Sequence, residues 1–85
     1  MEHSLKSLVR KTQSGDYEFI PELLEIAVLD RLGKLIWKAS RSSTQPHIRW
    51  DGRNTYGETL EGGSYLFKVV GLDRKEQYIP FVHGN

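Results

Sequence analysis

The sequence predicts an all-β fold, an antiparallel sandwich or small barrel of about seven short strands. Short segments rich in apolar, aromatic and β-branched residues recur at roughly 8–12-residue spacing, with a turn signal between each pair. No stretch of about ten residues has the apolar period of a helix, and no internal repeat or heptad is present. Strand-length segments separated by turns are typical of sandwiches and barrels, so the elements are expected to be strands.

The composition indicates one small domain over residues 1–85. Of the 85 residues, 38% are hydrophobic and 27% charged, which suits a single compact core. Twelve Lys and Arg against eleven Asp and Glu give a net charge of +1. The chain as a whole therefore has no electrostatic footprint for nucleic acid. Cysteine is absent, which excludes disulfides, thiolate metal sites and cysteine nucleophiles.

No targeting or membrane-spanning segment is expected. The first nine residues hold no apolar run long enough for a signal peptide, and no run approaches the ~20 apolar residues that cross a bilayer. Two origins fit these facts: a cytosolic chain, or one domain of a longer exported protein. We favour the second, and expect a secreted or cell-surface location as part of that longer protein.

The N-terminal part has the weakest strand signals. Residues 4–12 fit either a short edge strand or one turn of helix. Residues 13–16, Gln-Ser-Gly-Asp, form a turn by composition. A brief strand is expected over 17–20, ending before Pro21 because proline has no N–H to donate.

The first firm strand covers residues 23–30. Two apolar sets alternate along it: Leu24, Ile26 and Val28 on one face, and Leu23, Ala27 and Leu29 on the other, beside Glu25. Because both faces are partly covered, this strand is expected to be central in its sheet. Residues 31–34 then make a hairpin turn, and residues 35–40 return antiparallel.

A polar crossing loop follows this hairpin. Residues 41–46 have no apolar periodicity and end in a proline, so we expect a surface loop that passes from one sheet to the other. In the next strand, residues 47–50, Ile48 and Trp50 share one face. This order favours an immunoglobulin-like antiparallel sandwich, with the 41–46 loop as its Greek-key connection.

The C-terminal third contains the strongest strand. Residues 64–72 are rich in aromatic and β-branched side chains. A charged hairpin turn over 73–76 leads to the last strand, 77–82, which Pro80 marks as an edge strand. Residues 83–85 are expected to fray.

Oxygen-bearing side chains gather in the loop that begins at residue 51, where a calcium site is one interpretation. Arg53, however, occupies a position where a second carboxylate would be needed. Turn chemistry fits better: Asp51 and Asn54 would accept hydrogen bonds from backbone N–H groups, while Gly52 and Gly57 would adopt conformations forbidden to side chains.

Aromatic residues provide the candidate binding surface. Trp50 and Tyr65 are expected in the core, because large rings dominate the packing of small domains. Trp37 lies between lysines and is the best candidate for partial exposure. With Tyr56 and Arg53, and beside the 41–46 loop, it forms a candidate surface for a carbohydrate or protein ligand.

No catalytic or metal site is expected. His3, His47 and His83 have no ligand-like spacing, so we interpret them as independent surface residues, with His83 in the frayed end. The serines lie outside any Gly-x-Ser-x-Gly elbow. The chain is therefore expected to be no enzyme and to need no cofactor.

An ordered set of residues in the second half carries a family resemblance. It consists of Trp50-Asp51-Gly52-Arg53, Gly57, Leu60, Gly62-Gly63, Tyr65 and Phe67. This set resembles the signature of the gliding-motility-associated C-terminal domain, the type B sorting domain of the type IX secretion system in Bacteroidetes. It is also similar to the Ig-like domain of flagellar hook-capping proteins. The hairpin over 26–37 is similar to the corresponding strand, turn and return strand, so the resemblance covers residues 23–72.

The resemblance implies a non-catalytic Ig-like domain of an exported bacterial protein. Its expected role is secretion sorting or cell-surface attachment, with the secretion machinery or a cell-surface protein as partner. The alternatives are an accessory module that binds carbohydrate or protein, and an assembly scaffold of the hook-cap type. Within the motif, folding roles are expected for Trp50, Asp51, Gly52, Gly57, Gly63 and Tyr65.

Overall fold

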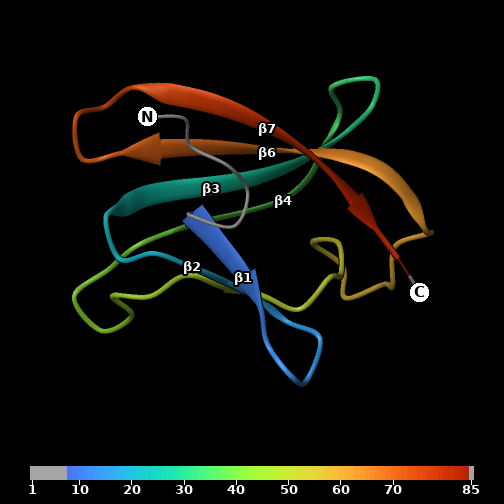
Figure 1. The fold of residues 1–85 in the computed structure, drawn as a ribbon, viewed down its shortest axis with the longest axis horizontal. Coiled ribbons are helices and arrows are strands. Elements are labelled where there is room, and N and C mark those ends of the chain that lie inside the picture. The colour runs from blue at the N-terminus through green and yellow to red at the C-terminus, as the bar shows by residue number, and fades with distance from the viewer. Residues whose placement is uncertain (1–7, 85) are drawn as a thin grey trace.

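Two antiparallel sheets form a β-sandwich in the computed structural model, which describes residues 8–84 (Figure 1). The three-stranded sheet has the order β1-β2-β5 and the four-stranded sheet the order β4-β3-β6-β7. The strands are β1 (Val9–Lys11), β2 (Tyr17–Phe19), β3 (Leu23–Asp30), β4 (Leu35–Ser40), β5 (Arg49–Trp50), β6 (Gly63–Gly71) and β7 (Glu76–His83). The predicted all-β sandwich class is thus confirmed. Of the segment expected as strand or helical turn, residues 4–7 lie outside the described part.

Short hairpins join neighbouring strands of the four-stranded sheet. In the β3–β4 turn, Oδ1 of Asp30 accepts hydrogen bonds from the backbone N–H groups of Leu32 and Lys34, at 2.9 and 2.8 Å. Within a tight turn, some backbone N–H groups have no backbone carbonyl to donate to, and a carboxylate such as that of Asp30 accepts their hydrogen bonds instead. β3 is central and β7 lies at an edge, as the sequence predicts.

The chain crosses between the sheets after β2, after β4 and after β5. Following β4, the N–H of Arg41 donates to the carbonyl oxygen of Leu24 at 2.8 Å, and Ser42 and Gln45 close a turn through their backbones at 3.1 and 3.2 Å. Residues 41–46 therefore belong to a connection from the four-stranded to the three-stranded sheet, which confirms the predicted crossing loop. Among residues 8–84, no helix has the length and apolar character needed to cross a bilayer.

Aromatic rings from both sheets fill the core. Trp50, Phe19 and Phe67 are among its largest fully buried side chains. The rings of Phe67 and Phe81 stack in parallel with centroids 3.7 Å apart, and Trp50 meets Phe67 edge-on at 5.8 Å. Burial of one such side chain contributes about 1.5–3 kcal/mol, so these few rings dominate the stability of a chain this short.

One prediction about β3 is wrong in detail. Leu23, expected on the face of Ala27 and Leu29, is buried in the core with Ile26 and Val28, whereas Leu24 is only partly buried. The register of β3 against β6 shifts between Leu23 and Glu25, which inserts one extra residue. Such a bulge reverses the alternation on one side of itself, so the face of Leu23 changes.

The expectation of a frayed end with a free His83 is also wrong. β7 continues through His83, which is paired with Gly63 and is 9% exposed. The alternation of Ile79 and Phe81, which face the core, extends to this residue. The other two histidines differ from it: His47 is exposed, and His3 lies outside the described residues.

Candidate functional site

The candidate site is built on the loop between β5 and β6, which begins at Trp50. This side chain is 1% exposed and packs against Tyr17 and Trp37, with ring centroids 5.1 and 5.9 Å away. Its indole N–H donates to the carbonyl oxygen of Arg53 at 2.8 Å. The loop is therefore fixed to the core at its first turn, because a buried donor must find a partner.

Asp51 and Gly52 form that first turn. Oδ1 of Asp51 accepts from the backbone N–H of Arg53 at 3.1 Å, and Gly52 has φ +82°, a left-handed conformation that L side chains rarely adopt. The Arg53 guanidinium returns over the loop. Its Nε lies 3.8 Å from Oδ2 of Asp51, and one Nη donates to the carbonyl oxygen of Gly57 at 3.0 Å.

A second turn covers residues 54–58. Oδ1 of Asn54 accepts from the N–H groups of Tyr56 and Glu58, both at 2.9 Å, and Nδ2 of Asn54 donates to a carboxylate oxygen of Glu58 at 2.8 Å. Gly57 closes the turn with φ +81°, and its N–H donates to the carbonyl oxygen of Asn54 at 3.0 Å. The hydrogen bonds expected of Asp51 and Asn54 are thus both present. Among the residues that the structure describes, no group of three or more His, Asp or Glu could hold a metal ion.

Thr55 attaches this second turn to the edge of β4. Its backbone N–H and its hydroxyl both donate to the carbonyl oxygen of Ile36, each at 3.0 Å. Tyr56 follows at the tip of the turn and is 87% exposed, while Trp37 follows Ile36 and is partly buried against Trp50. The candidate binding residues Trp37, Arg53 and Tyr56 therefore belong to one end of β4.

The 41–46 loop is separated from this group. It follows Ser40, which pairs with Glu25, whereas Ile36 lies at the other end of β4. Figure 1 shows the two loops on different sides of the view, the 41–46 loop at the lower left and the loop between β5 and β6 at the lower right. The structure thus places the turn that carries Tyr56 beside the start of β4, and the 41–46 loop after the other end of that strand.

Gly63 and Tyr65 complete the motif at the start of β6. Gly63 pairs with His83, and the phenol of Tyr65 donates to the carbonyl oxygen of Glu61 at 2.7 Å. The Tyr65 ring packs against Phe81 with centroids 6.0 Å apart. The start of β6 therefore packs against the same core that contains Trp50 of β5.

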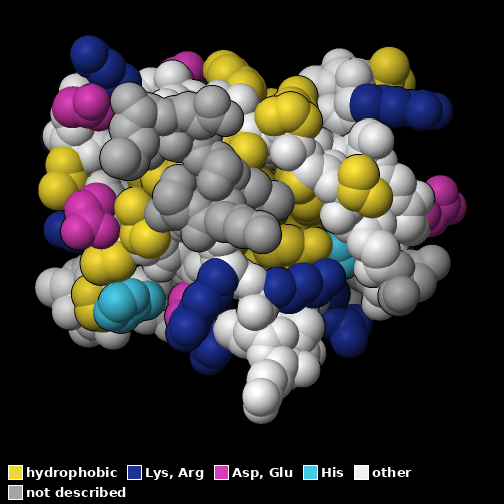
Figure 2. Space-filling view, viewed as in Figure 1, with side chains coloured by type: hydrophobic (Ala, Val, Ile, Leu, Met, Phe, Trp, Pro, Cys, Tyr) yellow, Lys and Arg dark blue, Asp and Glu magenta, His cyan; other side chains and the backbone are white. Residues whose placement is uncertain are grey.

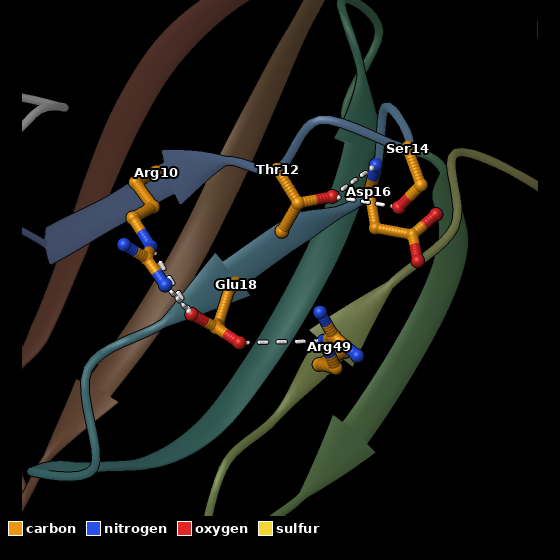
Figure 3. A network of polar contacts seen from close by, with 6 residues as sticks. All are labelled: Arg10, Thr12, Ser14, Asp16, Glu18 and Arg49. Atoms are coloured by element: carbon orange, nitrogen blue, oxygen red, sulfur yellow. Dashed lines mark hydrogen bonds and ion pairs between the residues drawn. The ribbon is translucent and has the colours of Figure 1, made fainter.

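A charged row that the sequence did not indicate crosses the outer face of the three-stranded sheet (Figure 3). Strand register aligns Arg10, Glu18 and Arg49. The Glu18 carboxylate accepts from Arg10 at 2.6 Å and lies 3.4 Å from Nε of Arg49. The hydrogen bond from Arg10 lowers the pKa of Glu18; partial burial opposes it, and the charges of Arg10, Arg49 and His47 reinforce it.

Figure 2 shows Lys and Arg side chains grouped on the lower half of this view, near the three-stranded sheet. One carboxylate, Glu18, lies between two of the arginines, so part of this positive charge is neutralised within the row. Only the pairing register of β1, β2 and β5 could have revealed the row, because its residues lie far apart in the sequence.

Comparison with known proteins adds information on the fold. No protein-family model matches the sequence, and no curated protein matches it. The structure is similar to a segment of PorZ, an essential bacterial surface component of the type IX secretion system of Porphyromonas gingivalis. The match has a TM-score of 0.57 at 18% sequence identity and covers 78% of this chain. The chain spans 9% of PorZ, and at this identity the likeness is one of fold.

Proposed function

We propose that this chain is a non-catalytic Ig-like domain of an exported bacterial protein that acts in secretion sorting or cell-surface attachment. The proposal rests on the motif resemblance, and the fold likeness to a type IX secretion component points in the same direction. The ordered motif from Trp50 to Phe67 resembles the type B sorting domains, and the fold is similar to a segment of a type IX secretion component. Fold likeness alone is weak evidence of function, so the sorting role in this proposal rests on the motif resemblance.

The geometry of the motif is compatible with a recognition role. The loop after Trp50 is held by internal hydrogen bonds and by the two bonds from Thr55 to Ile36. Tyr56, 87% exposed, stands at the tip of this fixed loop, and the Arg53 side chain, 52% exposed, lies across it. A preorganised surface loses little conformational entropy when it binds a protein partner. The translocation machinery is the partner that the resemblance implies.

A reporter fusion tests the proposal. Residues 1–85 are fused to the C-terminus of a fluorescent protein that carries an export signal, in a bacterium with a type IX system and in an isogenic strain lacking it. The reporter should reach the cell surface or medium in the first strain and stay in the periplasm in the second. Retention in both strains, or equal release from both, would contradict the sorting role. A fusion to an unrelated Ig-like domain of similar size serves as the control.

The exposed ring of Tyr56 favours a second candidate, an accessory module that binds carbohydrate or protein. Because the turn that carries Tyr56 is bonded to Ile36, next to Trp37, a ligand bound at Tyr56 should change tryptophan fluorescence. A titration with glycans and cell-surface proteins tests this, with Tyr56→Ser as the matched variant. Loss of the response in this variant supports the candidate, and a response unchanged by it contradicts the assignment. The hook-cap alternative predicts self-association, which sedimentation velocity measures.

A further inference from the structure

The buried imidazole of His83 lies where the ends of the two sheets meet. Rings from three other strands surround it: Tyr17 of β2, Trp50 of β5 and Tyr65 of β6, with centroids 6.1, 5.9 and 6.2 Å away. A Cβ added to Gly52 would lie 3.1 Å from Cε1 of His83, so the ring also lies close against the loop. This side chain therefore connects the end of β7 to the opposite sheet and to the Gly52 turn.

The hydrogen bonds of this group have a direction. Nζ of Lys11 lies 3.4 Å from the phenol oxygen of Tyr17, and Nδ1 of His83 lies 3.2 Å from the same oxygen. An ammonium group only donates, so the Tyr17 oxygen accepts from Lys11. Among the described residues, Nδ1 of His83 is the acceptor within reach of the buried Tyr17 O–H, so we assign the phenol as the donor to it. Nδ1 must then be an acceptor, which assigns His83 as neutral with its proton on Nε2.

Protonation of His83 would reverse that arrangement. Both ring nitrogens would become donors, so Nδ1 could no longer accept from the phenol O–H of Tyr17, and that buried O–H would lose its partner. The remaining groups around the ring are the neutral Trp50 and Tyr65 side chains and Gly52. Within residues 8–84 no ion pair joins His83 to a carboxylate that could stabilise the new charge.

We propose that His83 is an acid-sensitive latch: the neutral ring holds the end of β7 against Tyr17 and the Gly52 turn, and protonation releases that end. Histidine is the side chain whose charge changes near neutral pH, and its protonation is a known basis for such switches. The latch would make the exposure of the last strand and of the neighbouring loop depend on the pH of the surroundings.

The direction of the pH effect follows from linkage. Burial, and then the charge of Lys11, lowers the pKa of His83 from its ordinary value of 6.5. As the pH falls, the unfolded chain takes up this proton before the folded chain does. Stability is therefore complete above about pH 6.5 and is lost progressively as the pH falls through that value toward the lower pKa of the folded state.

Wild-type protein provides the direct test. An NMR titration of the histidine side chains should show His83 titrating below 6.5, with its proton on Nε2 at neutral pH. Hydrogen exchange, corrected for intrinsic rates, should show faster opening of the Gly52 and Val82 amides at pH 5.5 than at pH 7.5. A His83 pKa at or above 6.5, or a proton on Nδ1, would overturn the proposal without any variant being made.

Variants separate this latch from general acid sensitivity. Urea unfolding between pH 8 and pH 5 should show a steep loss of stability for wild type and for the control His47→Gln, which alters an exposed histidine. His83→Gln should reduce that loss, and Lys11→Gln should make it shallower by raising the pKa of His83. An unchanged pH dependence in His83→Gln would refute the latch.

Discussion

Substitution of Gly52 by alanine tests how tightly the loop after Trp50 packs on His83. Gly52 and Gly57 have nearly the same backbone conformation, with φ of +82° and +81°. An added Cβ would meet Cε1 of His83 at 3.1 Å in the first case and would find nothing within 4 Å in the second. The two variants therefore share the same backbone strain and differ by one contact.

The expected magnitudes follow from that difference. A left-handed alanine costs about 1–2 kcal/mol, which is the whole effect expected for Gly57→Ala. At residue 52 the imidazole is confined by Tyr17 and Trp50, so a further cost of about 1–3 kcal/mol for overpacking is expected. In a domain of this size each 1 kcal/mol lowers the melting temperature by roughly 4–8 °C.

Urea unfolding followed by tryptophan fluorescence measures both variants. Gly52→Ala should be less stable than Gly57→Ala by at least about 1 kcal/mol, the lower end of the overpacking cost. In a His83→Ala background, where the ring is absent, the cost of Gly52→Ala should fall to that of Gly57→Ala. Equal costs in the wild-type background would show that His83 moves away freely, and the tight packing inferred here would be wrong.

Three further predictions concern the same framework. Trp50→Phe should cost about 2–4 kcal/mol in urea unfolding, because it removes buried surface and leaves a carbonyl unpaired, whereas Trp37→Phe should cost clearly less. Thr55→Val removes one of two hydrogen bonds to β4 and should lower stability by about 0.5–1.5 kcal/mol, with faster amide exchange along β4 as the local readout. Glu18→Gln should lower stability near neutral pH. Because its carboxyl pKa is lowered from 4.5, the wild-type advantage should vanish as the pH falls below that value and shrink in high salt; an advantage that persists at low pH would refute the ion pair.

The sequence is sufficient to predict the strands after β1 because their signals are local, whereas it leaves residues 4–12 open between a strand and a turn of helix. Turn residues such as Asp30 form hydrogen bonds with their own turn, so their effect is visible within a few positions. The strands β3, β6 and β7 are long enough for alternation to be clear. The crossing after β4 was predictable for the same reason, since a polar segment closed by Pro46 cannot continue a strand.

The sequence predictions are wrong where a β-bulge or a contact between distant residues decides which side chains are buried. The bulge in β3 exchanges the faces of Leu23 and Leu24, and hydropathy cannot detect this exchange because both residues are leucine. The prediction of a frayed end at His83 overlooks that this residue continues the alternation of Ile79 and Phe81 on the buried face. That alternation is the signal in the sequence that indicates its burial.

The candidate binding residues depended on topology rather than on local pattern. Trp37 and Tyr56 share one end of β4 because Thr55 bonds to Ile36, a contact between residues 19 positions apart. The same topology places the 41–46 loop at the opposite end of the strand. Neither position can be deduced from the spacing of residues in the sequence, because each depends on which edge of a sheet the loop contacts in the fold.

The contact between Thr55 and Ile36 also limits how another molecule can pair with the edge of the four-stranded sheet. Among the strands of residues 8–84, β4 and β7 form the two edges of the four-stranded sheet. On β4, Thr55 already occupies the carbonyl of Ile36, and on β7, Pro80 has no N–H to offer to an incoming strand. Each edge strand therefore has one position at which a strand from another molecule cannot form the regular backbone hydrogen bond. Such positions oppose edge-to-edge pairing, which is a route to aggregation. Specific association is left to side chains on the faces and loops.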